Sequence, residues 1–265
     1  LRQIRTTVSF RTCNSIIHQD RTCKTINLVV SMPERGSSMS REDSHYRPYH
    51  HRRRHHHGGG GRRIPDRWLN YDPVGRDLEG TPFVPFKTPL DKSFFVGKDD
   101  LSEDEHFDVD RIVQYAREQG KTIGLVVDLT NTDRYYKKTD WENYNVKYIK
   151  MNCPGHEVSE REDIVQKFLE TVDEFVSDSS NDEKLIGVHC THGLNRTGYL
   201  ICRYLIDRKG WSAAQAISMF EYSRGHPIER GHYKKSLYEA EERIRKGTPT
   251  ENASTENGGG DATTP

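Results

Sequence analysis

Residues 187–198, GVHCTHGLNRTG, hold one cysteine, two histidines and one arginine at a spacing that suits phosphoryl chemistry. Five residues separate Cys190 from Arg196. A glycine-containing turn of this length that leads into a helix points successive backbone N–H groups into one concavity, which binds a phosphate. Arg196 adds a planar guanidinium that can hold two phosphate oxygens at once. The stretch therefore predicts a phosphate cradle with a cysteine at its base.

Cys190 is the candidate nucleophile of this cradle. A free cysteine has a pKa of about 8.5 and is mostly neutral at pH 7, whereas inward N–H groups, a helix N-terminus and Arg196 all favour the reactive thiolate. Thr197 can hydrogen-bond the sulfur and help it to leave a phosphoenzyme. We expect His189 to hydrogen-bond the backbone behind the loop and to order it. The other residues expected to contact the phosphate are Thr191, His192, Gly193, Leu194, Asn195 and Gly198.

Two other roles for Cys190 are open at this point. It can be an inert buried thiol at the end of a strand, which is common for cysteine. It can also contribute to a zinc site made from CPGH (153–156) and HCTH (189–192). Neither spacing is a common structural zinc pattern, and Arg196 would repel the cation. The pairing of cysteine with arginine favours the nucleophile, with no metal and no cofactor.

The segments around the cradle predict how it is positioned. Strand and helix patterns alternate through residues 64–246, and this alternation is typical of a mostly parallel sheet covered by helices on both faces. In such sheets a ligand binds at the carboxyl ends of the strands, where a loop enters a helix. The expected strands are 122–130, 146–152 and 185–190, and the expected helices are 160–178, 197–210, 212–224 and 231–246.

The composition of the chain hides a charge asymmetry. Lysine plus arginine and aspartate plus glutamate each number 40, but residues 1–63 hold 13 basic and only 4 acidic side chains. The histidine- and arginine-rich arm 41–63 has a low-complexity composition that predicts disorder, and its charge favours a polyanionic partner such as a nucleic acid. The alternative is a solvated tail that only aids solubility. The odd number of cysteines argues against a disulfide framework, and no apolar run is long enough for a membrane span.

The ends of the chain are expected to lie outside the folded domain. Residues 1–40 are predicted to be disordered or non-native upstream sequence, with Met32 or Met39 as the true start. The composition of residues 1–31 also resembles that of a mitochondrial transit peptide. Residues 247–265 are predicted to be a disordered tail. One domain, 64–246, remains.

The stretch HCTHGLNRTGYLICRYLID (189–207) resembles the catalytic loop of the cysteine-dependent phosphatases, His-Cys-x5-Arg-Thr-Gly. More narrowly, residues 64–238 resemble the RNA 5′-phosphatase branch of the dual-specificity group. That branch includes the phosphatase domain of metazoan mRNA capping enzymes and the RNA/RNP-complex-interacting phosphatases, and the last block below looks closer to the second. The matching blocks are IPDRWLNYDPVG (64–75), PFKTPL (85–90), VVDLTNTDRYY (126–136), KLIGVHC (184–190) and SRGHPIERGHY (223–233).

The chain departs from the wider family at the general acid. Many members carry an aspartate on the loop that corresponds here to CPGHEVS (153–159), and Gly155 stands at the expected position. Release of a tyrosine, whose pKa is near 10, needs a proton. Release of a phosphate with a second pKa of about 6 does not. The site is therefore better suited to phosphoanhydrides, unless His156 or Glu157 replaces the acid.

Further residues are assigned through the resemblance. Asp128 ends a strand at the same edge of the sheet, and the family likeness suggests that it supports catalysis, for example by orienting water or Arg196. The alternative for Asp128 is a turn cap. Several cations are candidates to hold further phosphates, although any of them can equally be a solvated surface charge. These are Lys87, Arg134, Lys137, Lys138, Arg224 and Arg230.

The predicted function is removal of the γ and then the β phosphate from 5′-triphosphorylated RNA, through a cysteinyl-phosphate intermediate. The expected partners are tri- or diphosphorylated RNA and, by resemblance, ribonucleoprotein or small-RNA processing factors, with no membrane contact. The protein is expected to be a monomer, and the resemblance suggests a nuclear location, with the cytoplasm as the alternative. The rival functions are a tyrosine or dual-specificity protein phosphatase and a module that binds RNA 5′ phosphates without turnover.

Overall fold

The computed structural model describes residues 62–155 and 157–247. Predictions made for residues 1–61, for His156 and for 248–265 lie outside these described residues. All strands and helices of the described part lie between Trp68 and Gly247. No helix among the described residues is long and apolar enough to cross a membrane.

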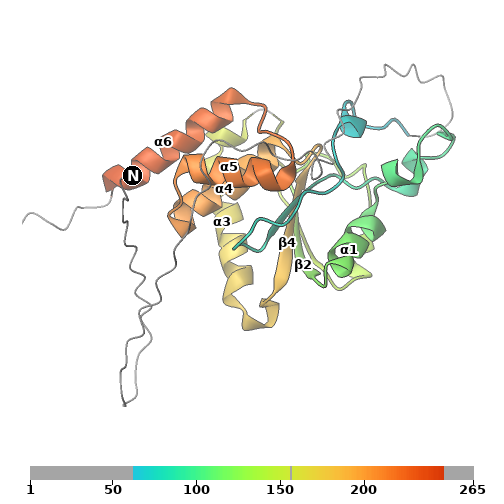
Figure 1. Cartoon of the computed structure of the whole chain (residues 1–265), viewed down its shortest axis with the longest axis horizontal. Coiled ribbons are helices and arrows are strands. Elements are labelled where there is room, and N and C mark those ends of the chain that lie inside the picture. Colours follow the sequence, from blue (N-terminus) through green and yellow to red (C-terminus); the bar gives the residue numbers. More distant parts are fainter. Residues whose placement is uncertain (1–61, 156, 248–265) are drawn as a thin grey trace, which may run out of the picture. The chain divides into compact units, whose positions relative to one another are not determined.

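The strands of the described residues form one parallel sheet (Figure 1), so the predicted α/β class is confirmed. Their order across the sheet is β1-β4-β2-β3, which places β4 between two neighbours. Because the strands are parallel, their carboxyl ends meet at one edge, and loops that follow different strands can build one site there. The strands are β1 (Phe83–Lys87), β2 (Thr122–Asp128), β3 (Lys147–Lys150) and β4 (Lys184–Cys190).

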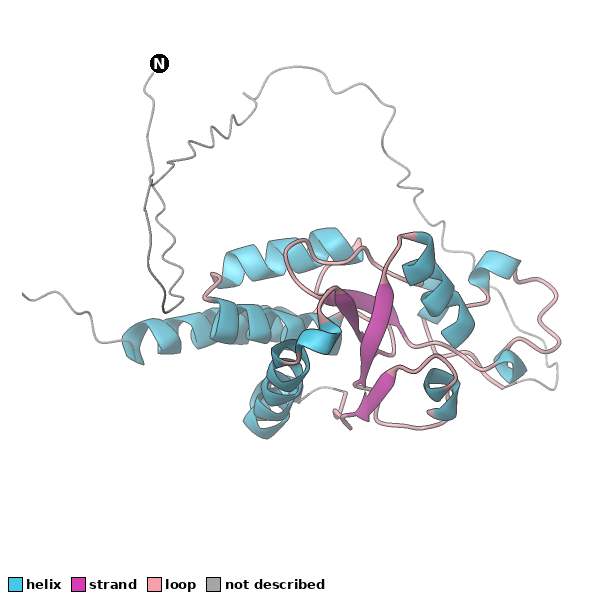
Figure 2. Ribbon diagram, turned by 90° about the horizontal axis from the view of Figure 1, so that it is seen from below, coloured by secondary structure: helices cyan, strands magenta, loops and turns pink. Residues whose placement is uncertain are grey.

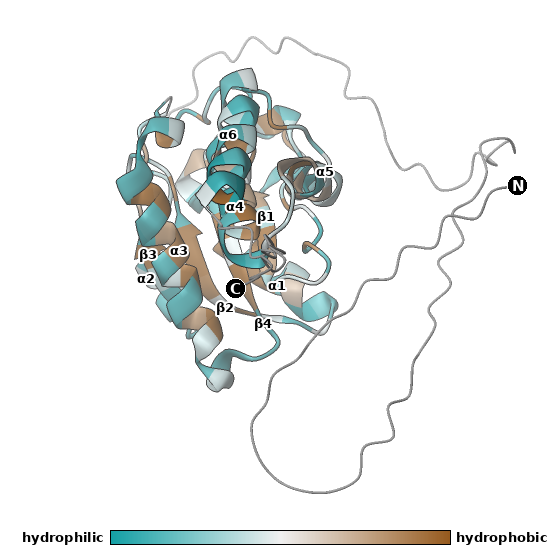
Figure 3. Cartoon of the chain, turned by 90° about the vertical axis from the view of Figure 1, so that its left-hand side faces the viewer, coloured by the Kyte–Doolittle hydropathy of each residue, from teal (hydrophilic) through white to brown (hydrophobic). Residues whose placement is uncertain are grey.

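Helices cover both faces of this sheet (Figure 2). Four helices pack on one face, and two shorter ones pack on the other. Figure 3 shows the apolar strands enclosed between helices whose outer faces are hydrophilic. The first face carries α3 (Glu162–Ser177), α4 (Asn195–Lys209), α5 (Ala213–Arg224) and α6 (Gly231–Gly247), and the second carries α1 (Val109–Glu118) and α2 (Thr139–Glu142).

Successive side chains of β4 point to opposite faces of the sheet. Ile186, Val188 and Cys190 point into the core beneath α3 and α4. His189 points to the opposite face, where its ring lies 5.0 Å from that of Phe86. The cysteine and the histidine of the motif therefore lie on opposite faces of the sheet.

The start of one predicted helix and the presence of three further elements differ from the sequence-based expectation in ways that matter for the site. α4 begins at Asn195 and not at residue 197, so Arg196 lies in its first turn. β1 was not predicted because it is short and contains Pro85, which is tolerated here at the sheet edge. The helices α1 and α2 were not predicted either. α1 did carry a signal, since Asp108 caps it by accepting a hydrogen bond from the Arg111 backbone N–H.

Candidate active site

The catalytic loop, residues 190–196, connects β4 to α4 at the carboxyl edge of the sheet. Gly193 has a φ of 69°, in the left-handed region that favours glycine. A Cβ at this position would lie 2.2 Å from the backbone oxygen of Phe86 in β1. The Thr88 backbone N–H also donates to the oxygen of Thr191, at 3.2 Å. The loop is thus seated directly on the backbone of the neighbouring strand.

The Cys190 thiol is almost fully buried at the base of this loop, with 3% of its surface exposed. Burial alone would raise its pKa. The positive charge of Arg196 and hydrogen bonds from Thr197 and from the His192 backbone outweigh burial, and the pKa of Cys190 is lowered. The Thr197 hydroxyl is fully buried without an oxygen or nitrogen partner, so its hydrogen is free for the sulfur. The loop therefore favours the thiolate, the reactive form of cysteine.

Arg196 is held in place by three acceptors. Its Nη1 donates to the backbone oxygens of Leu129 and Cys153, each at 2.9 Å, and its Nη2 donates to Thr191 Oγ1 at 3.1 Å. These acceptors come from the segment after β2, the segment after β3 and the catalytic loop itself. The guanidinium is therefore oriented before any phosphate arrives, which is the arrangement that charge stabilisation in a transition state requires.

Asp128 lies behind the loop, not in it. Its carboxylate accepts hydrogen bonds from Tyr148 Oη at 2.9 Å and Tyr136 Oη at 3.1 Å, and it forms an ion pair with Lys150 Nζ at 3.0 Å. Burial raises the pKa of Asp128, but the charge of Lys150, the hydrogen bond from the Thr130 backbone N–H and the interaction with His189 outweigh burial and lower it. A carboxyl group held in this way stays ionised and cannot donate a proton at neutral pH.

His189 joins this cluster to the strand of the nucleophile. Its Nε2 lies 2.6 Å from Tyr136 Oη and 3.8 Å from Asp128. Burial lowers the pKa of His189. Asp128 and His189 were expected near the loop, whereas the two tyrosines and Lys150 around them were not predicted. Arg196 meets the backbone of Leu129, the residue after Asp128, and has no recorded hydrogen bond to the Asp128 carboxylate.

Two cations that were expected to hold phosphates lie beneath the loop instead. Arg224 is 1% exposed, and it donates to the backbone oxygens of Gly193 and His192, each at 3.1 Å. Lys87 is 2% exposed, and its Nζ donates to the backbone oxygens of Trp68 and Tyr71. The prediction that these side chains contact substrate is therefore corrected. They support the loop and its surroundings from behind.

The remaining predicted cations lie at or near the carboxyl edge of the sheet. Arg134, Lys137 and Lys138 are exposed on the segment after β2, and Arg134 stacks on Tyr135 at 5.1 Å. The backbone N–H of Arg230 donates to Asn195 Oδ1 at 3.1 Å, which joins the α5–α6 connection to the catalytic loop.

Leu194 and Gly198 anchor the loop from inside. Leu194 is fully buried. A Cβ at Gly198 would lie 2.6 Å from the ring of Phe220 in α5. These two residues pack beneath the loop, and this packing fixes the position of their backbone.

The described part of the 153–159 loop contains no aspartate. Gly155 is exposed, and a Cβ built there meets no atom within 4 Å. Glu157 is exposed as well, and His156 lies outside the described residues. Cys153, in the same loop, is fully buried, and burial raises the pKa of its thiol to about 12. Among the described residues, no group of three histidine, cysteine or acidic side chains is arranged to hold a metal ion.

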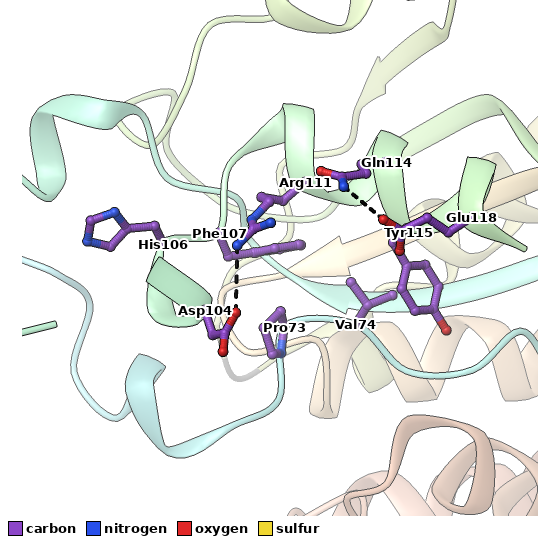
Figure 4. A pocket seen from close by; sticks show the side chains of 9 residues that line it. All are labelled: Pro73, Val74, Asp104, His106, Phe107, Arg111, Gln114, Tyr115 and Glu118. Atoms are coloured by element: carbon purple, nitrogen blue, oxygen red, sulfur yellow. Dashed lines mark hydrogen bonds and ion pairs between the residues drawn. The ribbon is translucent and has the colours of Figure 1, made fainter. Parts of the chain in front are cut away.

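A shallow groove on the α1 face is separate from this site (Figure 4). Within it Arg111 pairs with Asp104 at 3.7 Å and Gln114 bonds to Glu118 at 2.8 Å. The groove contains no residue of the catalytic loop. It is lined by Pro73, Val74, Asp104, His106, Phe107, Arg111, Gln114, Tyr115 and Glu118.

Comparison with known proteins identifies the family. Residues 110–243, which include the catalytic loop, match the family model of the dual-specificity phosphatase catalytic domain. The chain belongs to the dual-specificity phosphatases. The parallel sheet with a cysteine–arginine loop between a strand and a helix is the fold that the sequence resemblance implied, and that resemblance is confirmed.

Relatives of this phosphatase carry two kinds of name. The RNA/RNP complex-1-interacting phosphatase homolog of Caenorhabditis elegans is 66% identical over 70% of this chain and 79% of its own length. The human RNA/RNP complex-1-interacting phosphatase is 47% identical over 66% of this chain and 51% of its own length. A tyrosine-protein phosphatase of Autographa californica nuclear polyhedrosis virus is 40% identical over 66% of this chain and 98% of its own. The match therefore spans about half of the human relative.

Proposed function

We propose that this phosphatase hydrolyses the phosphoanhydride bonds at the 5′ end of RNA, removing the γ and then the β phosphate to leave a 5′-monophosphate. The observation that carries the proposal is a complete cysteine–arginine loop beside a 153–159 loop whose sequence contains no aspartate. Gly155 stands where an acid is expected, and Asp128 is held ionised behind the loop. A leaving phosphate needs no proton at neutral pH, whereas a leaving tyrosine does.

The chemistry has two steps. The Cys190 thiolate attacks the terminal phosphorus, the S–P bond forms, and the bond to the bridging oxygen breaks with its electron pair on the departing polyphosphate end. The Arg196 guanidinium and the loop N–H groups stabilise the charge on the equatorial oxygens. Water then attacks the cysteinyl phosphate and releases inorganic phosphate, while the Thr197 hydroxyl stabilises the departing thiolate.

The surroundings of the loop support a nucleic-acid substrate. Arg134, Lys137 and Lys138 are exposed on the segment after β2, and none of them forms an ion pair with a carboxylate of the described residues. Two relatives carry names that refer to an RNA/RNP complex. On this proposal the partners are 5′-polyphosphorylated RNA and ribonucleoprotein factors, and the site of action is the nucleus.

The proposal is tested by product analysis in the presence of a chelator. The full chain is incubated with RNA labelled at the γ or the β phosphate, and Cys190→Ser serves as the inactive control. Release of both labels in sequence is expected. Release of the γ label alone would limit the activity to the first phosphate, as in capping-type triphosphatases. Binding of the RNA with no release would identify a module without turnover.

A second candidate function is a protein tyrosine or dual-specificity phosphatase. The viral relative carries such a name, and Glu157 is an exposed carboxyl group in the loop where an acid is expected. If Glu157 donates the proton, Glu157→Gln lowers turnover of a phosphotyrosine peptide and leaves turnover of polyphosphorylated RNA unchanged. Equal effects on the two substrates would remove this argument for Glu157.

A further inference from the structure

The segment 65–72, which precedes the first strand, forms part of the wall of the catalytic loop. The backbone oxygen of Asp66 lies 2.7 Å from His192 Nε2. The ring of Tyr71 lies 5.2 Å from that of His192. Arg224 Nη2 links this segment to the loop, since it donates both to the Asp72 oxygen and to the His192 oxygen. The segment is therefore fixed against the loop at several points.

Arg67 occupies an unusual backbone conformation within this segment. Its φ is 60°, in the left-handed region that a residue with a Cβ rarely adopts. Such a conformation persists where the surroundings impose it, and it often marks a functional position. Here it turns the side chain, which is half exposed, toward the α5–α6 connection. The guanidinium forms an ion pair with Glu229, with Nη1 at 3.3 Å from Oε2, and also bonds to Tyr71 Oη.

Glu229 stands directly at the rim of the loop. Its backbone N–H donates to Asn195 Oδ1 at 2.9 Å, and Asn195 Nδ2 lies 3.5 Å from its carboxylate. Although burial raises the pKa of Glu229, the hydrogen bonds and the charge of Arg67 lower it overall. A carboxylate beside an anion-binding loop repels a phosphate unless a cation neutralises it. Arg67 supplies that cation.

We propose that Arg67 is a substrate-binding residue that holds the second phosphate of a 5′ polyphosphate chain and is shared between that phosphate and Glu229. The inference rests on the proposed function and names the residue that distinguishes a polyphosphate end from a single phosphate. The terminal phosphate is bound by the backbone N–H groups of the loop and by Arg196. The next phosphate of the chain then lies at the rim of the loop. The half-exposed guanidinium can turn from the carboxylate to this phosphate, because it bonds planar anions of either kind.

If Arg67 is shared in this way, substitutions of Arg67 and of Glu229 should change the affinity for a 5′-triphosphate in opposite directions. Arg67→Gln removes the cation, whereas Glu229→Gln removes its competitor and releases the guanidinium. A pair that only holds the segment 65–72 in place would respond to both substitutions in the same direction. The matched control is Arg208→Gln, which breaks the exposed ion pair with Asp173 near the far end of α4.

The test measures dissociation constants in the Cys190→Ser background, for one RNA sequence carrying either a 5′-triphosphate or a 5′-monophosphate. The affinity ratio of triphosphate to monophosphate is expected to fall about tenfold in Arg67→Gln, to rise in Glu229→Gln, and to stay unchanged in Arg208→Gln. Equal loss of affinity for both RNAs, or a fall of the ratio in both Arg67→Gln and Glu229→Gln, would overturn the inference. Because binding is measured without turnover, a failure of the proposed hydrolysis is detected separately with the unsubstituted protein.

Discussion

Arg196 Nη1 donates to the backbone oxygen of Cys153 at 2.9 Å, so the arginine of the catalytic loop is held by the loop in which an acid is expected. In this phosphatase the 153–159 loop contributes a carbonyl that orients the phosphate clamp. Through this contact the loop positions Arg196 without supplying a proton.

An acid added to this loop should change the substrate preference. Gly155→Asp places a carboxyl group where a Cβ meets no neighbouring atom, so the substitution is not expected to disturb packing. We expect kcat for a phosphotyrosine peptide to rise about tenfold, since general acid catalysis contributes at least that much. Turnover of triphosphorylated RNA should stay within about twofold, because its leaving group needs no proton. Gly155→Asn is the control that adds a similar side chain without a proton donor, and a rise with asparagine as well would contradict the explanation.

The thiolate of Cys190 should depend on Thr197. Because the pKa of Cys190 is lowered in part by the Thr197 hydroxyl, Thr197→Val raises it. The rate of alkylation by iodoacetamide follows the thiolate fraction. The midpoint of this rate against pH, followed by mass spectrometry on the peptide that contains Cys190 because the chain has four other cysteines, should therefore move to higher pH in Thr197→Val. An unchanged midpoint would show that Thr197 does not bond to the sulfur.

Gly193 and Gly210 offer a matched pair for backbone strain. Their φ angles are 69° and 68°, both in the left-handed region. A Cβ on Gly193 would lie 2.2 Å from the Phe86 backbone oxygen, whereas a Cβ on Gly210 would meet no atom within 4 Å. We expect Gly210→Ala to lower the free energy of unfolding by about 1 kcal/mol, and Gly193→Ala to lower it by about 3 kcal/mol or more. Urea unfolding measures both values. Similar losses at the two positions would argue against the close seating of the loop on β1.

Lys87 should make stability depend on pH in a defined direction. Burial, followed by the nearby charge of Arg224, lowers the pKa of Lys87 to about 7, below the ordinary value of 10.5. Between these two values the unfolded chain binds the proton and the folded chain does not, so stability rises with pH through this window. Below about pH 7 the cost of burying the charge is fully present.

Lys87→Met removes this dependence. The free energy of unfolding of the variant minus that of the unsubstituted protein should therefore be largest near pH 6. This difference should fall as the pH rises toward 10. Urea unfolding at several pH values gives the difference directly. A difference that stays constant with pH would mean that the lysine keeps its ordinary pKa in the folded protein.

The central part of the fold was predictable because its signals are local. A buried β-branched strand, a loop with cysteine and arginine, and a helix ending at Gly210 follow one another in the sequence, and the structure contains them as β4, the loop and α4. β1 was not predictable in the same way, because Pro85 and only five residues give a weak strand pattern.

The roles of the charged residues depended on burial, which the sequence does not reveal. Lys87 and Arg224 look like surface cations in the sequence, yet the fold places both beneath the loop. Tyr136 lies in the segment after β2, whereas Tyr148 and Lys150 lie in β3, so they meet around Asp128 only when β2 and β3 pair. Arg67 lies in a block that matches the family, but its contact with Glu229 spans 162 positions and has no local signature.

The measurement that tests the central claim most directly is the ratio of two kcat/KM values for the unsubstituted protein at neutral pH. One substrate is 5′-triphosphorylated RNA and the other is a phosphotyrosine peptide, with Cys190→Ser as the blank for both. The missing acid predicts that the RNA is the better substrate by at least about a hundredfold. A phosphotyrosine peptide that is hydrolysed as well as or better than the RNA would contradict the account.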